Sequence, residues 1–263
     1  MNIRGITISV GYGPLLAVTL PRAMRHLSEC LVVTTPDDDE THIVASRTPG
    51  VRVLTTDAFT RHGARFNKGL GMEEGFDTLG REGWILIFDA DIVMPDILPA
   101  GGIKPDCLYG ARRRILPDPS EWSDDLEWRS LPMLRDGGPI GFFQCFHATA
   151  LKGRRPWYDV SFAHAGGGDA YFMTHWTRDK WTVLPIDVLH LGLPDKNWFG
   201  LDETGRDMMD AFVHRNGWRR AMPRADPSAV ERVGMIPERV SVPGYDASTF
   251  ELPFVNRTRH RPT

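Results

Sequence analysis

The chain of 263 residues has a hydrophobic fraction of 41%, a charged fraction of 25% and a formal net charge of -3. These fractions are ordinary for a globular protein and exclude disorder over the whole chain. The length allows one α/β domain, alone or with an appended lobe. The small net charge gives no general attraction to nucleic acid or anionic membranes.

Apolar stretches and cysteines indicate the compartment. No apolar run approaches the roughly 20 residues that a membrane helix needs, and Met1-Asn2-Ile3-Arg4 leads directly into a strand pattern instead of a signal peptide. Cys30, Cys107 and Cys145 are widely spaced among apolar neighbours, which indicates reduced core residues and neither a disulfide framework nor a zinc site. We therefore expect a cytoplasmic protein with no integral membrane segment.

Strand-like and helix-like segments alternate from the N-terminus. Residues 3–10 predict a strand, and the turn residues 11–14 break it before a helix over residues 15–26. Further strands are predicted over residues 31–35, 51–55, 84–88 and 183–189, and a further helix over residues 66–78. Such alternation is typical of an α/β fold with a mainly parallel sheet and helices on both faces.

The pattern is looser after residue 91. Residues 112–138 mix three consecutive arginines with prolines, tryptophans and acids, which predicts a long irregular excursion over the ligand-binding edge of the sheet. Order returns over residues 139–148, and a helical run follows the glycines at 166–168. Toward the C-terminus, residues 204–216 predict a helix, followed by a tail rich in proline and arginine.

Two aspartates one residue apart, Asp89 and Asp91, directly follow the apolar run of residues 84–88. That run is apolar on both alternating faces, as expected of an inner strand covered on both sides. Strand ends of this kind form the ligand-binding edge of an open α/β sheet, and paired carboxylates suit a hard divalent cation shared with a phosphate. Asp-x-Asp is also a frequent cap or turn. Its position favours a metal-dependent enzyme acting on a phosphorylated substrate.

Four short motifs, taken in order, resemble the GT-A fold nucleotide-sugar glycosyltransferases of the family-two type. They are the N-terminal strand with its short turn, the Asp-x-Asp sequence, the helix start Gly166-Gly167-Gly168-Asp169 and the strand end His190-Leu191-Gly192. The resemblance spans about residues 3 to 200. It implies a Rossmann-like GT-A domain over residues 1–203, with a nucleotide-sugar half to about residue 95 and an acceptor half after it. Residues 204–263 would form a helical, basic extension.

The activity that this resemblance implies is transfer of a sugar from a nucleoside diphosphate sugar, by default a UDP-sugar, to a hydroxyl acceptor. A bound Mn2+ or Mg2+ stabilises the charge that builds on the departing diphosphate. By the resemblance Asp91 coordinates the cation directly, Asp89 binds it through water or holds the ribose, and His190 completes the metal shell. An ordinary surface or core histidine is the alternative for His190.

The resemblance also implies donor contacts at the ends of the first two strands and beside the diphosphate. The residues concerned are Val10, Gly11 and Tyr12 at the first strand, Thr35 and Asp37 for the base or ribose, Lys68 and Lys196 for the phosphates, and Gln144 for the sugar. Tyr12 would stack on the base or simply pack. Gly69 would give backbone room beside the diphosphate. Lys196 lies in a segment expected to close over the diphosphate, with a solvated lysine as the alternative.

Asp169 is the candidate base that takes the proton from the acceptor hydroxyl if transfer inverts the anomeric configuration. The glycines before it allow a sugar to approach closely, whereas a plain N-cap is the alternative for an aspartate at a helix start. Trp157 and Tyr158 would stack on a sugar ring or pack in the core. The acceptor stays open between a glycan and a hydroxymethylated DNA base, because the basic tail 257–261 fits DNA phosphates.

Other classes of protein compete with this interpretation. The sequence from Asp89 to Val93 also resembles the nucleophile motif of haloacid-dehalogenase-type phosphatases, in which the first aspartate is phosphorylated. That motif normally opens a chain, whereas three strand-like segments precede it here, and Met173 stands four residues after Asp169 where an acid is expected. A nucleotidyltransferase with the same metal site, or a nucleotide-sugar-binding protein without turnover, are further alternatives.

Overall fold

The computed structural model describes residues 1–99, 101–134 and 138–193. Lys196, the helix expected over residues 204–216, the basic tail and the domain boundary at residue 203 lie outside the described residues. None of the described helices is long and apolar enough to cross a membrane.

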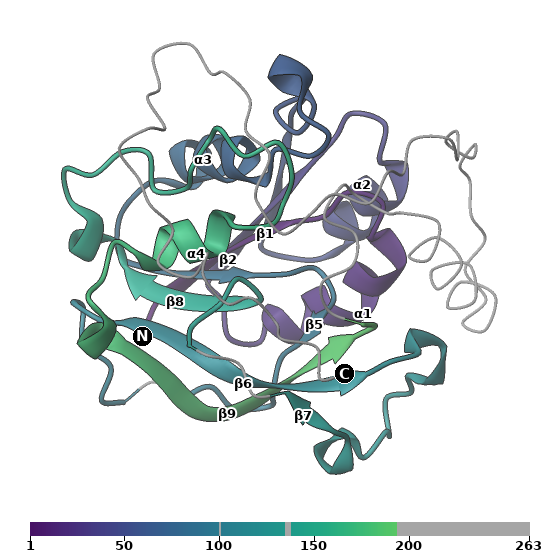
Figure 1. Cartoon of the computed structure of the whole chain (residues 1–263). Helices are drawn as coiled ribbons and strands as arrows, with labels where there is room; N and C mark the ends of the chain where they lie inside the picture. The colour runs from purple at the N-terminus through teal and green to yellow at the C-terminus, as the bar shows by residue number, and fades with distance from the viewer. Residues whose placement is uncertain (100, 135–137, 194–263) are drawn as a thin grey trace, which may run out of the picture.

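One sheet organises the described chain, with strand order β3-β2-β1-β4-β8-β6-β9-β5 and with β7 paired to β6 (Figure 1). The strands are β1 Ile3–Ile8, β2 Glu29–Thr34, β3 Val51–Thr55, β4 Trp84–Phe88, β5 Ile92–Val93, β6 Leu108–Leu116, β7 Met133–Leu134, β8 Phe143–His147 and β9 Trp181–Leu191. The helices are α1 Gly13–Ala23, α2 Asp39–Arg47, α3 Lys68–Leu79 and α4 Gly168–Met173. Short 3-10 turns cover Arg61–Gly63, Pro119–Glu121, Trp128–Ser130, Ala148–Leu151 and Arg178–Lys180.

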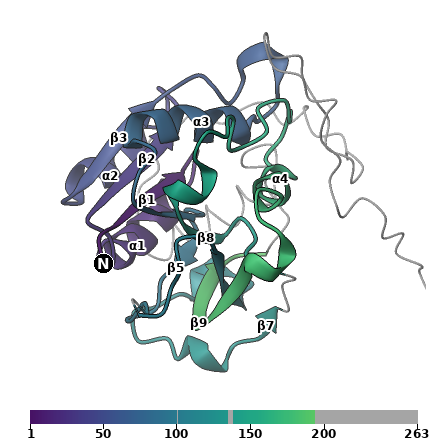
Figure 2. The same cartoon turned by 90° about the vertical axis from the view of Figure 1, so that its left-hand side faces the viewer.

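The N-terminal half is parallel and covered on both faces, as expected. Strands β3, β2, β1 and β4 all pair in parallel. On β4, Leu86 and Phe88 join the core beneath α1 and α2, whereas Ile85 and Ile87 join the core beneath α3. Figure 2 shows these helices on opposite sides of the sheet. Because strands apolar on both faces need cover on both sides, the predicted α/β class is confirmed.

The second half of the sheet is mixed. Strand β8 pairs antiparallel with β4 and β6, whereas β6 and β9 are parallel. The two-residue strand β5 follows β4 closely and pairs antiparallel with β9, with Ile92 opposite His190. This pairing brings the end of β4 beside the end of β9.

Two expectations from the sequence were incomplete or wrong. The sequence predicted an irregular excursion over residues 112–138. This prediction was wrong for residues 112–116, which continue β6, and for residues 133–134, which form β7. Arg112 and Arg114 lie in β6 because both pair with Asp187 of β9, at 2.6 and 2.8 Å. Helix α2 was not expected; the Asp38 side chain caps it by accepting a hydrogen bond from the Thr41 N–H.

Candidate active site

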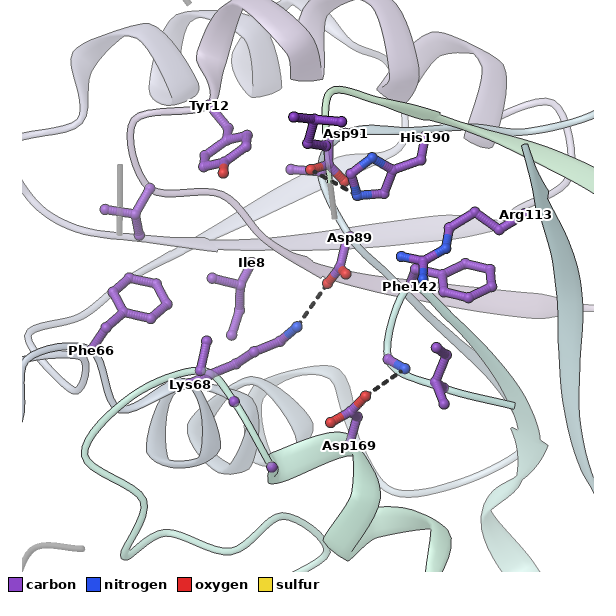
Figure 3. Close-up of a pocket in the computed structure, with 18 residues that line it drawn as sticks. Ile8, Tyr12, Phe66, Lys68, Asp89, Asp91, Arg113, Phe142, Asp169 and His190 are labelled. Carbon is purple, nitrogen blue, oxygen red and sulfur yellow. Dashed lines mark hydrogen bonds and ion pairs between the residues drawn. The ribbon is translucent and has the colours of Figure 1, made fainter. Parts of the chain in front are cut away.

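A cavity of about 250 Å³ lies at the edge of the sheet where β1, β4 and β9 end. Its walls come from these strand ends, from the start of α3, from the loop before β8 and from the glycine-rich segment before α4 (Figure 3). This is the edge at which an open α/β sheet binds ligands. The predicted residues Val10, Tyr12, Lys68, Asp89, Asp91, Asp169 and His190 all line the cavity.

Asp91 and His190 face each other at one end of the cavity. The pairing of β5 with β9 sets their positions, and the Leu191 N–H donates to the Asp91 carbonyl at 3.0 Å. The His190 Nε2 lies 3.6 Å from the Asp91 Oδ2, and only 9% and 15% of the two side chains is exposed. This distance is too long for a good hydrogen bond.

The ring of His190 is held with one nitrogen directed at Asp91. Its Nδ1 lies 2.8 Å from the Gly192 carbonyl oxygen, which can only accept, so Nδ1 donates and Nε2 is the nitrogen available to a metal ion. The Asp91 Oδ1 is buried without a hydrogen-bond partner among the described residues. Burial raises the pKa of Asp91, an effect that His190 opposes.

A divalent cation fits this pair of side chains. An unpartnered buried carboxylate oxygen is costly, and an ion held by carboxylate and neutral imidazole would satisfy both this oxygen and the His190 Nε2. The described residues contain no preformed group of three or more His, Cys, Asp or Glu side chains able to hold a metal. The expected triad of Asp89, Asp91 and His190 is therefore not assembled: Asp91 and His190 supply two ligands, and Asp89 is paired elsewhere.

Asp89 forms an ion pair with Lys68 inside the cavity. The Lys68 Nζ lies 2.7 Å from the Asp89 Oδ1. Burial opposes the charged form of Lys68, but the carboxylates of Asp89, Asp169 and Asp91 outweigh that effect, so the pKa of the ammonium lies above its ordinary value. Lys68 therefore stays positively charged among these carboxylates.

Asp169 lies in the first turn of α4 and points into the cavity. The N-cap is Gly167 in a left-handed conformation, so the alternative of a plain aspartate N-cap does not apply. The Gly141 N–H donates to the Asp169 Oδ2 at 3.0 Å. A Cβ at residue 141 would stand 2.8 Å from the Asp169 Cβ, so this contact requires glycine.

Four predicted donor residues do not line the cavity. Asp37 is exposed and Thr35 is half-buried outside the cavity, whereas the neighbouring Asp38 is buried and accepts hydrogen bonds from the Gly11 N–H and the Thr34 hydroxyl. Gly11 thus shapes the turn before α1 without lining the cavity. Gln144 is fully buried and does not line the cavity.

Gln144 serves the core instead. Its amide nitrogen donates to the Pro139 carbonyl at 2.8 Å, and its amide oxygen accepts from the Tyr158 hydroxyl at 2.8 Å. Trp157 and Tyr158 are buried against Phe76, so the packing alternative holds for both. The space beside the Gly69 backbone, which was expected to admit the diphosphate, is occupied by the Asp159 carbonyl. Its oxygen lies 2.1 Å from where a Cβ of residue 69 would stand.

Sequence reasoning missed several residues that line the cavity. Arg113 lies on β6 with its guanidinium 4.4 Å from the centre of the Phe142 ring, and Phe66 precedes α3. A strand alternates its side chains, so a strand over residues 112–114 would have separated Arg113 from the two arginines that pair with Asp187. That alternation was the available signal for Arg113.

No protein-family model matches this sequence, and no curated protein matches it. Among solved structures, glucosyl-3-phosphoglycerate synthase of Mycobacterium tuberculosis has a TM-score of 0.46 at 13% identity, over 90% of this chain and 89% of that one. The same enzyme with Mn2+, UDP and glucosyl-3-phosphoglycerate has a TM-score of 0.46 at 16% identity, over 84% of this chain and 81% of that one.

A second kind of transferase is as similar. The 4-diphosphocytidyl-2C-methyl-D-erythritol synthase of Anaerococcus prevotii has a TM-score of 0.45 at 13% identity, over 82% of this chain and 98% of that one. Values this low establish neither a family nor an activity for this chain, so function must be argued from the site itself.

Proposed function

We propose that this protein is a metal-dependent glycosyltransferase that moves a sugar from a nucleoside diphosphate sugar, with UDP-sugars favoured, to a hydroxyl acceptor. One observation carries the proposal: the unpartnered Asp91 Oδ1 lies beside a histidine whose Nε2 faces the same carboxylate, with the Lys68 ammonium in the same cavity. Carboxylate, imidazole and ammonium together match a divalent cation bound to a diphosphate.

Five of the residues that line the cavity bind the donor and the metal ion in this proposal. Asp91 and His190 would hold Mn2+ or Mg2+, which neutralises charge on the departing diphosphate when bound. Lys68 would contact a phosphate oxygen, and Val10 and Tyr12 would line the nucleotide end. Together these groups hold the donor in one orientation and stabilise the leaving group.

Asp169 would take the proton from the acceptor hydroxyl. The Gly141 N–H occupies its Oδ2, which leaves Oδ1 to accept the hydroxyl proton. A carboxylate fixed in this way is held in position for general-base catalysis. The acceptor that we propose is a glycan hydroxyl or the hydroxyl of a hydroxymethylated DNA base.

The released product distinguishes this proposal from its alternatives. Purified protein would be incubated with Mn2+ and a panel of sugar nucleotides, with glycans and hydroxymethylated DNA as acceptors. Release of nucleoside diphosphate supports glycosyl transfer, whereas pyrophosphate indicates a nucleotidyltransferase, and acid-labile phosphate on Asp89 indicates a phosphatase. Thermal stabilisation without any product indicates a binding protein.

A matched pair of variants ties the activity to the site. Asp91→Ala should abolish Mn2+-dependent stabilisation by the donor. Asp106→Ala removes a surface aspartate paired with Lys180 and should leave that stabilisation unchanged. If Asp91→Ala bound donor and Mn2+ as well as the wild type does, the proposed site would be wrong.

A further inference from the structure

Lys68 is paired with Asp89 in this structure, whereas the proposed function needs the Lys68 ammonium free to contact a phosphate. The ammonium and the carboxylate are 2.7 Å apart, with 16% and 35% of their side chains exposed. Figure 3 shows the lysine extending across the cavity to Asp89. In this arrangement the lysine neutralises the Asp89 carboxylate.

The charges in the cavity make a metal ion and Lys68 compete. Asp91 and Asp169 also attract the ammonium, so Lys68 is the counter-ion of three carboxylates. A dication held by Asp91 and His190 would bring two further positive charges to the same carboxylates. Like charges at a few ångströms repel strongly in a partly buried site, so metal binding would weaken the hold of Asp89 on Lys68.

When a metal ion binds, only the side chain of Lys68 can move, because its backbone is held in place. The preceding Asn67 accepts from the Leu70 N–H at 2.8 Å and donates to the Val160 carbonyl at 2.7 Å. The contact of Gly69 with the Asp159 carbonyl holds the other side. A lysine side chain is a flexible four-carbon stem carrying a point charge, so it can exchange one oxygen partner for another while α3 stays in place.

We propose that Lys68 is an internal cation that competes with the metal for Asp89, and that metal binding transfers it from Asp89 to the diphosphate of the donor. This inference rests on the proposed function. Since the metal releases Lys68 and Lys68 then holds the diphosphate, each ligand would strengthen binding of the other. Metal and donor affinity would therefore be coupled through one side chain.

Lys68→Met gives opposite expected effects on the two ligands. It removes the competing charge while keeping much of the stem, so the affinity for Mn2+ alone, measured by electron paramagnetic resonance, should rise by about 5-fold or more. The affinity for UDP in the presence of Mn2+, measured by calorimetry, should fall by about 5-fold or more. Lys180→Met is the matched control, because Lys180 pairs with Asp106 at 2.6 Å on the surface. It should change neither affinity.

Asp89→Asn tests the same exchange from the other side. With Asp89 neutral, Lys68 is available without metal, so metal-free UDP binding should tighten. Loss of negative charge alone could cause the same gain, and the double variant Lys68→Met/Asp89→Asn separates the two causes. The gain should disappear in the double variant if it comes from the released lysine.

The outcomes are distinguishable. Opposite shifts of Mn2+ and UDP affinity in Lys68→Met support the exchange. A loss of both affinities, or no change in either, overturns it while leaving the proposed function intact. Retention of the UDP gain in the double variant also overturns it. A wild-type protein that binds neither Mn2+ nor any nucleotide overturns the proposed function and this inference together.

Discussion

His190 faces Asp91 because Ile92, next to Asp91, pairs with His190 between β5 and β9. The two residues are 99 positions apart in the numbering (190 minus 91), yet their side chains meet at 3.6 Å. A two-residue strand thus sets the geometry of the candidate metal ligands. The proposed metal binding and catalysis would therefore depend on that short pairing.

Asp91→Asn should separate stability from activity. The carboxylate oxygen Oδ1 is buried and unpartnered, so a neutral amide should raise the free energy of unfolding of the metal-free protein by about 1 kcal/mol. The same change should lower Mn2+-dependent turnover by about 100-fold or more. Urea unfolding without metal, together with turnover in saturating Mn2+, checks both. A destabilised variant with normal turnover would contradict the assignment.

Gly141→Ala should impair catalysis more than donor binding. A Cβ at this position would stand 2.8 Å from the Asp169 Cβ, so the Asp169 carboxylate must shift from its present position. We expect kcat to fall by about 10-fold or more, with the KM for the donor nearly unchanged. Gly101→Ala adds a Cβ with no atom within 4 Å and serves as the control. A rise in the donor KM alone would argue against Asp169 as the base.

Gln144→Leu should destabilise the fold and spare nucleotide binding. It leaves the Pro139 carbonyl and the Tyr158 hydroxyl without their partner, and both hydrogen bonds are buried. The free energy of unfolding should fall by about 1–3 kcal/mol. The affinity of the folded variant for UDP in Mn2+ should stay unchanged. A selective loss of UDP affinity would restore Gln144 as a donor contact.

His175 should make the fold sensitive to acid. Burial lowers the pKa of His175 below its ordinary 6.5, and the charge of Arg154 adds to that effect. The unfolded chain therefore binds a proton at higher pH than the folded protein. The stability is fully present above about pH 6.5 and is lost as the pH falls from there through the folded pKa.

The matching variant is His175→Gln. Its amide can still donate to the Trp157 carbonyl, which His175 contacts at 2.9 Å, but it does not titrate. Urea unfolding at about pH 7.5 and about pH 5.5 should show a smaller loss of stability in the variant than in the wild type. An equal loss in both proteins would show that other groups cause the acid sensitivity.

The elements that were predicted well are those that a short local sequence pattern is enough to specify. Residues 84–88 form a strand with the predicted bounds because an apolar, β-prone run bounded by turns has few alternatives. Residues 51–55 also form a strand with the predicted bounds, from a β-prone segment of mixed polarity whose side chains are only partly buried or exposed. Helix α2 has a largely polar sequence and depends on its cap at Asp38. Strand β6 carries three arginines that a strand tolerates only because Asp187, from a distant segment, pairs with two of them.

The candidate site, like the fold, could be predicted only where local sequence and sheet topology determine a residue's position. Residues at strand ends, such as Asp91 and His190, could be located because the topology of an open sheet collects those ends at one edge. The pairing of Lys68 with Asp89 and the burial of Gln144 depend on packing between distant segments. No local sequence signal encodes that packing.

Anomalous diffraction from crystals grown with Mn2+ and UDP tests the central claim most directly. We predict a manganese peak within bonding distance of Asp91, His190 and the diphosphate oxygens, with about 2.0–2.2 Å to each protein ligand, by analogy with nitrogen and oxygen ligands of other divalent ions. The result that would contradict the account is UDP bound in the cavity with no manganese peak between Asp91 and the diphosphate.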